Sequence, residues 1–163
     1  MTFVVDCMLG KLAKWLKILG FDAVFFNKIE DHALLEIAKK EDRILLTRDT
    51  ELMGKTKEAK SLFIESENWR MQVEQVLDHF DIWRDVKPNS RCIECNVRIK
   101  DLTREKAKNL VTPFVFENAD TFALCPDCGR VFWRGTHLKD METKIDDFLN
   151  KRKIPFNEWD NDE

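Results

Sequence analysis

Apolar positions in the first half of the chain follow two alternating patterns. Four short apolar runs are typical of buried strands, at residues 3–5, 23–26, 44–47 and 62–64. Apolar residues at helical spacing predict amphipathic helices between and after these runs, at residues 9–19, 31–41, from about 50, and 69–80. Strands that alternate with helices favour right-handed crossovers and a mostly parallel sheet. We therefore expect an α/β fold with a four-stranded sheet flanked by helices.

Residue types that commonly begin or end helices support these assignments. Gly20 follows the first helical segment, where a C-terminal glycine is frequent. Asp31 stands at the start of the second helix and is expected to cap it. Near the C-terminus, Thr136 is expected to cap a final helix that turns five apolar residues inward: Leu138, Met141, Ile145, Phe148 and Leu149.

A change of composition at residues 86–90 marks the expected domain boundary. Proline and small polar residues gather there, directly before the first of two CxxC pairs. The sequence predicts a core at residues 1–87, a small cysteine-containing module with a terminal helix at 91–153, and an acidic tail at 154–163.

Length and composition are those of a globular protein. The chain has 163 residues, of which 44% are hydrophobic and 35% are charged, so a packed core is expected. Its apolar runs are far shorter than the roughly 20 residues that cross a bilayer. Lysines spread through the N-terminal apolar stretch argue against a secretory signal. We expect a cytoplasmic protein with no membrane partner.

Four of the five cysteines form two CxxC pairs with the spacing of a structural zinc site. They are Cys92, Cys95, Cys125 and Cys128. Each pair can present two thiolates from one tight turn, and two such turns complete a tetrahedral site with bonds of about 2.3 Å. Four sulfur ligands leave no position for water, so the expected zinc is structural. The alternatives are unligated thiols or a redox dithiol, which a reducing compartment makes less common.

Charge is unevenly distributed along the chain. The net charge is −3 in total, with −2 over residues 1–90, +3 over 91–153 and −4 over 154–163. A zinc ion held by four thiolates carries a net charge of −2, which lowers the surplus of the middle segment to about +1. Charge alone therefore predicts no electrostatic trap for nucleic acid.

Three aspartates are candidates for a second metal site. Asp6 follows the first strand, Asp49 comes two residues after the third, and Asp31 precedes the helix between the second and third strands. Ligand sites in open α/β sheets form beyond the carboxyl ends of strands, so we expect these side chains in one crevice. Three carboxylates repel each other unless a cation lies among them. Oxygen ligands suit Mg²⁺ or Mn²⁺, the ions that activate water against a phosphodiester.

Each acidic residue also has a purely structural interpretation. Asp31 can act as a helix cap, a role compatible with metal binding, and Asp49 can form a turn. Asp6 can simply end its strand. Three glutamates are more typical of a solvated surface than of ligands: Glu30, Glu65 and Glu67. Cys7 is more typical of a small core residue than of a nucleophile, because no activating base lies near it in sequence.

Several segments of the chain match a known family. The segments Asp6–Leu16, Leu19–Asp22 and Leu46–Asp49 resemble the Mut7-C family of PIN-like domains. The segments Arg91–Asn96 and Cys125–His137 are similar to the ribbon that follows the PIN-like core in that family. The resemblance covers roughly residues 2–149.

The resemblance implies a PIN-like nuclease fold and metal-dependent cleavage of RNA. The acidic positions of the family fall on Asp6, Asp31 and Asp49, the three residues that the strand ends also select. PIN nucleases commonly carry a further acid, often a glutamate on a helix, and no residue of this sequence is assigned to it. Three functions stay open: a Mg²⁺- or Mn²⁺-dependent ribonuclease, a non-catalytic RNA- or ribosome-binding adaptor, and a protein-interaction module that docks through the ribbon.

Basic and aromatic residues near these segments are candidates for holding RNA. Beside the acidic positions these are Lys11 and Arg48, of which Arg48 is favoured as a phosphate ligand. In the ribbon they are Arg130, Trp133, Arg134 and His137. Aromatic rings beside arginines stack unpaired bases in single-strand binders, whereas packing of the ribbon is the alternative role for Trp133 and its neighbour Phe132. His137 can equally cap or pack the last helix.

Overall fold

The computed structural model describes residues 1–134 and 136–150, and side chains at 136–139 and 141 lie outside that description. The chain forms two compact units, Met1–Asn96 and Val97–Glu163, and each has its own sheet.

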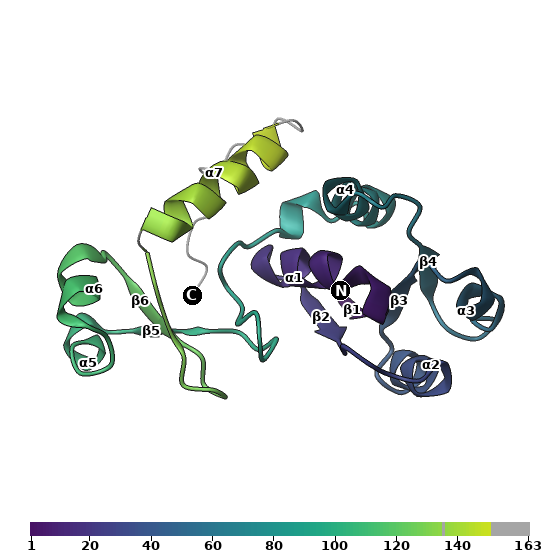
Figure 1. Cartoon of the computed structure of the whole chain (residues 1–163), viewed down its shortest axis with the longest axis horizontal. Coiled ribbons are helices and arrows are strands. Elements are labelled where there is room, and N and C mark those ends of the chain that lie inside the picture. The colour runs from purple at the N-terminus through teal and green to yellow at the C-terminus, as the bar shows by residue number, and fades with distance from the viewer. Residues whose placement is uncertain (135, 151–163) are drawn as a thin grey trace. The chain divides into compact units, whose positions relative to one another are not determined.

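The first unit is built on a sheet of four parallel strands in the order β2-β1-β3-β4 (Figure 1). The strands are β1 Thr2–Val5, β2 Asp22–Phe25, β3 Ile44–Thr47 and β4 Ser61–Phe63. The order reverses its direction between β1 and β3. In open sheets of this kind the carboxyl ends on either side of that reversal border the ligand site.

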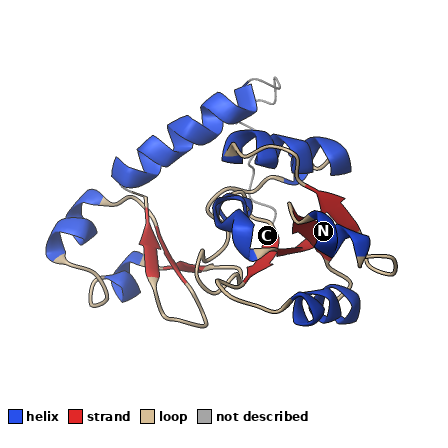
Figure 2. Ribbon diagram, turned by 45° about the vertical axis from the view of Figure 1, so that its right-hand side comes forward, coloured by secondary structure: helices blue, strands red, loops and turns tan. Residues whose placement is uncertain are grey.

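Helices cover both faces of this sheet (Figure 2). They are η1 Cys7–Leu9, α1 Gly10–Ile18, α2 Asp31–Lys40, α3 Thr50–Gly54, α4 Trp69–Phe80 and η2 Trp83–Asp85. Successive strand residues point to opposite faces, so Phe3 and Val4 belong to different cores. Val4 packs with Leu34 of α2 and Leu52 of α3. The Phe3 ring instead meets Phe80 of α4 at a centroid distance of 5.8 Å.

Gly20, just after α1, lies directly against the backbone of the segment at 86–90. Its φ of +93° is a conformation that side chains rarely adopt, and a Cβ there would overlap the carbonyl oxygen of Lys87. The backbone N–H of Lys87 donates to Leu19 O at 2.8 Å, and that of Asn89 donates to Ile18 O at 2.9 Å. The segment after η2 is thereby fastened to the end of α1.

The second unit holds a three-stranded antiparallel ribbon in the order β5-β6-β7. Its elements are β5 Lys100–Leu102, α5 Arg104–Ala107, α6 Pro113–Asn118, β6 Phe122–Leu124, β7 Val131–Trp133 and α7 Thr136–Asn150. Ala107, Ala119 and Phe122 form a small core. The Arg104 guanidinium lies 4.3 Å from the Phe116 ring centroid and donates to the carbonyls of Phe116 and Ala119.

The four predicted strands and the helix at residues 69–80 are confirmed. Of the inward positions predicted for the last helix, Ile145, Phe148 and Leu149 are buried, whereas Leu138 and Met141 lie outside the described side chains. The prediction that Asp31 caps α2 is wrong, because Glu30 occupies the cap position and Asp31 is the first helical residue. Within the described residues, no helix is both long and apolar enough to cross a membrane.

Candidate active site and metal centre

Asp6 and Asp49 meet at the carboxyl edge of the sheet through Thr47. Asp6 follows β1 and is only 6% exposed, while Thr47 ends the neighbouring strand β3 and is fully buried. Thr47 Oγ1 donates to Asp6 Oδ2 at 2.7 Å and accepts from the Asp49 backbone N–H at 3.0 Å. One hydroxyl therefore fixes the position of Asp6 and the backbone of Asp49 relative to each other.

Asp49 is also the N-cap of α3. Its Oδ1 accepts from the backbone N–H groups of Glu51 at 2.8 Å and Leu52 at 3.1 Å. Both hydrogen bonds go to the same carboxylate oxygen, and together they hold the side chain in one orientation. From the sequence, Asp31 was expected to cap a helix and a turn was the structural alternative for Asp49, whereas in the structure Asp49 is the helix cap.

Asp31 lies at the start of α2 and pairs with a lysine from α3's end. The Lys55 Nζ lies 3.2 Å from Asp31 Oδ2, and both side chains are about half exposed. Cys7 follows Asp6 and is exposed. Partial desolvation of its thiol first, then a hydrogen bond and negative charge from Asp6, and finally negative charge from Asp31, raise the pKa of Cys7.

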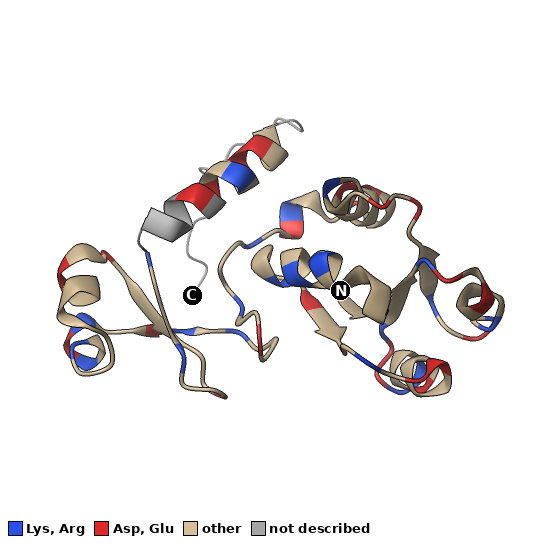
Figure 3. Cartoon of the chain, viewed as in Figure 1, with Lys and Arg blue, Asp and Glu red and all other residues tan. Residues whose placement is uncertain are grey.

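The three aspartates, which were expected in one crevice, do not form a group whose carboxylates are close enough to share one ion. Among the residues that the structure describes, the four cysteines are the one group of three or more ligand-type side chains with mutual distances short enough to share an ion. In Figure 3 acidic residues are seen on α2, α3 and the loop after β4, whereas α1 carries only lysines as charged residues.

The four cysteines form a cluster whose ligand atoms lie within 4.8 Å of one another. Tetrahedral zinc bonds of about 2.3 Å place sulfurs roughly 3.8 Å apart, so the cluster fits zinc. The two CxxC turns are alike: Cys95 N–H and Cys128 N–H each approach the sulfur of the first cysteine in their pair at 3.5 Å. Each turn ends on a residue with positive φ, Asn96 at +60° and Gly129 at +72°.

The first CxxC turn is fastened to the parallel sheet by Asn96. Its Oδ1 accepts from Ala23 N at 3.0 Å, and its Nδ2 donates to Asp22 Oδ1 at 2.8 Å. The same Asp22 oxygen accepts from the Arg43 guanidinium. Burial by itself raises the pKa of Asp22, but the hydrogen bonds from Arg43 and Asn96 outweigh it and hold that pKa below its ordinary value.

A comparison with protein families decides where this arrangement belongs. Residues 1–145 match the family described as Mut7-C RNAse domain. The chain belongs to this family. Comparisons with curated proteins and with solved structures give no match. The family description indicates a ribonuclease-like function, with RNA as the substrate class.

In this Mut7-C domain, some of the residues predicted to hold RNA are paired with other protein groups and others are exposed. Arg48 Nη1 donates to Glu65 O at 2.8 Å, and its Nη2 lies 3.6 Å from Glu67 Oε1, so it supports the loop after β4. Lys11 is exposed on α1. Arg134 pairs with Glu142 at 3.2 Å, and Trp133 is 41% exposed. Arg130 is exposed, and the side chain of His137 lies outside the described residues.

Two features of the Mut7-C domain were missed by sequence reasoning. The first is the contact of Thr47 with Asp6 and Asp49. Thr47 is a polar residue that ends an otherwise apolar strand directly before Arg48 and Asp49, and this placement is the sequence feature that could have indicated its role. Trp15 and Trp69 stack with centroids 4.4 Å apart and planes 7° from parallel. A pair separated so far in sequence leaves no local signal.

Proposed function

We propose that the chain is a Mg²⁺- or Mn²⁺-dependent ribonuclease that hydrolyses RNA phosphodiester bonds at Asp6, Asp31 and Asp49. The observation that carries the proposal is the buried Asp6 carboxylate, hydrogen-bonded to Thr47 where the strand order reverses. A buried carboxylate is costly unless it is paired or serves a cation. The family match supports RNA as the substrate.

The carboxylate oxygens that remain available support a metal at this edge. Asp49 uses Oδ1 for its helix cap and Asp31 uses Oδ2 for Lys55, so each keeps a second oxygen for the ion. An ionised carboxylate has about four lone-pair sites, so Asp6 can bind an ion and still accept from Thr47. A divalent ion there would activate water and neutralise charge on the phosphate.

The chain's own residues position the acids. Thr47 holds Asp6 and the backbone of Asp49 in register, and the cap of α3 fixes the Asp49 side chain. In this proposal, residues 1–87 cleave the RNA, and the ribbon within residues 91–153 helps to bind it. Trp133 and Arg130 are exposed ribbon side chains suited to that task.

The test compares cleavage of single-stranded and structured RNAs by wild type and Asp49→Asn in the presence of Mn²⁺. Asparagine is also a good N-cap, so α3 is retained while the ligand charge is removed. The matched control is Asp81→Asn, an exposed position at the end of α4 whose positive φ asparagine tolerates. Cleavage should be lost in Asp49→Asn alone, with fold and zinc content unchanged.

Binding of RNA by wild type and Asp49→Asn, with cleavage by neither, would contradict the ribonuclease proposal. That result favours the non-catalytic adaptor. The ion pair between Asp31 and Lys55 is the observation that makes the adaptor worth testing, because a lysine already neutralises one of the three acids.

A further inference from the structure

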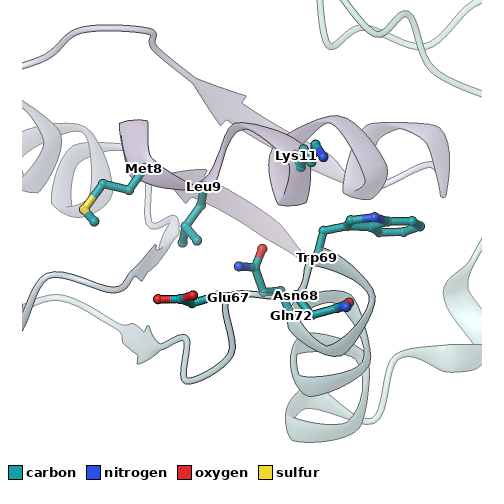
Figure 4. A pocket seen from close by; sticks show the side chains of 7 residues that line it. All are labelled: Met8, Leu9, Lys11, Glu67, Asn68, Trp69 and Gln72. Carbon is teal, nitrogen blue, oxygen red and sulfur yellow. The ribbon is translucent and has the colours of Figure 1, made fainter.

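A pocket of about 320 Å³ lies between the start of the first helices and the start of α4 (Figure 4). It is lined by Met8, Leu9, Lys11, Glu67, Asn68, Trp69 and Gln72. Its walls come from η1 and α1 on one side and from the loop after β4 with the first turn of α4 on the other. Its size lies within the range typical of small-molecule sites.

Both walls of this pocket continue directly from the proposed catalytic residues. Met8 and Leu9 belong to η1, which begins at the residue after Asp6. On the opposite wall, Glu67 is paired with Arg48, the residue before Asp49. The pocket walls are thus connected to the proposed catalytic edge through η1 on one side and through the Arg48–Glu67 ion pair on the other, which favours a pocket that serves the same RNA strand.

The polar side chains of the pocket have the chemistry that recognises the edge of a base. Asn68 caps α4 by accepting from Arg70 N at 2.9 Å through Oδ1, which leaves the Nδ2 hydrogens as donors. Gln72 is 5% exposed, and its Nε2 donates to Ser66 O at 2.8 Å, which leaves Oε1 as an acceptor. Glu67 adds a carboxylate acceptor and Lys11 a cation.

Amide side chains pair with adenine N6 and N7 and lysine pairs with guanine O6 and N7, so these residue types favour purines. A carboxylate accepts from an exocyclic amine, which adenine, guanine and cytosine carry and uracil lacks, so Glu67 selects against uracil. Within the apolar lining, the Trp69 ring is stacked on Trp15, and the Arg70 guanidinium lies 5.3 Å from its centroid. Because Trp15 and Arg70 already contact the Trp69 ring, Trp69 forms a wall of the pocket. The choice between bases then depends on the polar side chains.

We propose that this pocket is a subsite for a purine base of the RNA strand, adjacent to the nucleotide at the aspartates. Asn68, Glu67 and Gln72 contact the base, and Lys11 contacts its phosphate or its O6/N7 edge. The inference rests on the proposed ribonuclease function for its substrate, but base recognition here needs no cleavage. This proposal assigns the base specificity of RNA binding to the loop after β4.

The test measures binding of labelled pentanucleotides that differ only in the central base, adenine, guanine, cytosine or uracil between uracils. Fluorescence anisotropy is recorded with zinc retained and no Mg²⁺ or Mn²⁺ added, and gels verify that the RNA is intact. The variants are Asn68→Ser, which keeps an N-cap but removes the amide, and Glu67→Gln, which removes the carboxylate. Thr112→Ser, a cap exchange at α6, is the matched control.

Wild type should bind the purine-centred strands about tenfold more tightly than the uracil strand, a ratio typical of one good base contact. Asn68→Ser and Glu67→Gln should each lose most of this preference while Thr112→Ser keeps it. Equal affinity for all four bases overturns the proposal, as does a purine preference that both pocket variants retain. Purine-selective binding by a protein that cleaves no RNA supports the pocket and contradicts only the nuclease.

Discussion

Thr47 Oγ1 donates a 2.7 Å hydrogen bond to Asp6 Oδ2, and both side chains are buried where adjacent parallel strands end. The same hydroxyl oxygen accepts from the backbone N–H of Asp49. Since a single side chain serves both acidic positions, Thr47 links the ends of β1 and β3 at the proposed site.

Replacing Thr47 with valine should damage both stability and activity. Valine keeps the shape but removes the hydroxyl, so Asp6 loses a buried donor and Asp49 N loses its acceptor. The free energy of unfolding should fall by about 1–3 kcal/mol, measured by urea denaturation, and RNA cleavage should drop. Thr47→Ser keeps the hydroxyl and should retain activity. Equal activity of the valine and serine variants would show that the hydroxyl does not position the acids.

Removing Lys55 should make the acidic site easier to load with metal. The Lys55 Nζ lies 3.2 Å from Asp31 and competes with any cation for that carboxylate. Lys55→Met should therefore lower the Mn²⁺ concentration needed for half-maximal cleavage several-fold. Stability should change by less than about 1 kcal/mol because the pair is exposed. Lys39→Met, which removes an exposed pair with Glu58, is the control and should leave the Mn²⁺ requirement unchanged.

The Asp22 carboxyl should contribute a pH-dependent part of the stability. Its folded-state pKa is lowered, because hydrogen bonds from Arg43 and Asn96 outweigh the opposing effect of burial. The contribution is therefore fully present above the ordinary aspartate pKa of about 3.9 and is lost as pH falls through the lower folded value. In urea unfolding between neutral pH and about pH 3, Asp22→Asn should be less stable than wild type near neutrality and should approach it in acid.

Asp81→Asn provides the comparison for this pH series, since Asp81 is exposed at the end of α4. The free energy of unfolding of this variant, plotted against pH, should run parallel to that of wild type. A constant difference between Asp22→Asn and wild type at every pH would show that the ionised carboxylate is not what stabilises this edge of the sheet.

Zinc should be held by the four-cysteine cluster at about one ion per chain. Cys125→Ser removes a buried ligand and should abolish stoichiometric zinc in elemental analysis, with loss of protected amides in the ribbon. Cys7→Ser is the matched control, because this exposed cysteine lies outside the cluster. Retention of zinc and of folded structure by Cys125→Ser would rule out a structural four-sulfur site.

The stacked tryptophans should be visible spectroscopically. Parallel rings 4.4 Å apart couple their transitions, so wild type should show paired circular dichroism bands that both Trp15→Phe and Trp69→Phe abolish. Loss of the pair should cost about 0.5–1.5 kcal/mol beyond the lost area. Trp133→Phe, on the exposed end of β7, should leave the bands intact. Bands that persist in Trp15→Phe would argue against the stack.

Local pattern was sufficient for the elements that bury a continuous apolar surface. The strands of a parallel sheet are covered on both faces, so β1 and β3 are visible as apolar runs, and α4 is visible from its periodicity. Of the ribbon strands, β5 reads KDL and carries two charged residues, so it leaves no apolar run. The strands β6 and β7 are apolar runs of three residues, FAL and VFW, that were not assigned from the sequence. Helix capping was misassigned because Glu30 and Asp31 are neighbours and composition does not separate them.

The sequence by itself determined the α/β class, the four cysteine positions and the acidic residues at strand ends, because spacing along the chain encodes each of these. Only the tertiary structure decided which side chains act on those acids. Thr47 reaches Asp6 across paired strands, Lys55 reaches Asp31 from another helix, and Trp69 stacks on Trp15. Such partners are chosen by strand order and helix packing, and a single side chain's type carries no record of what the fold brings beside it.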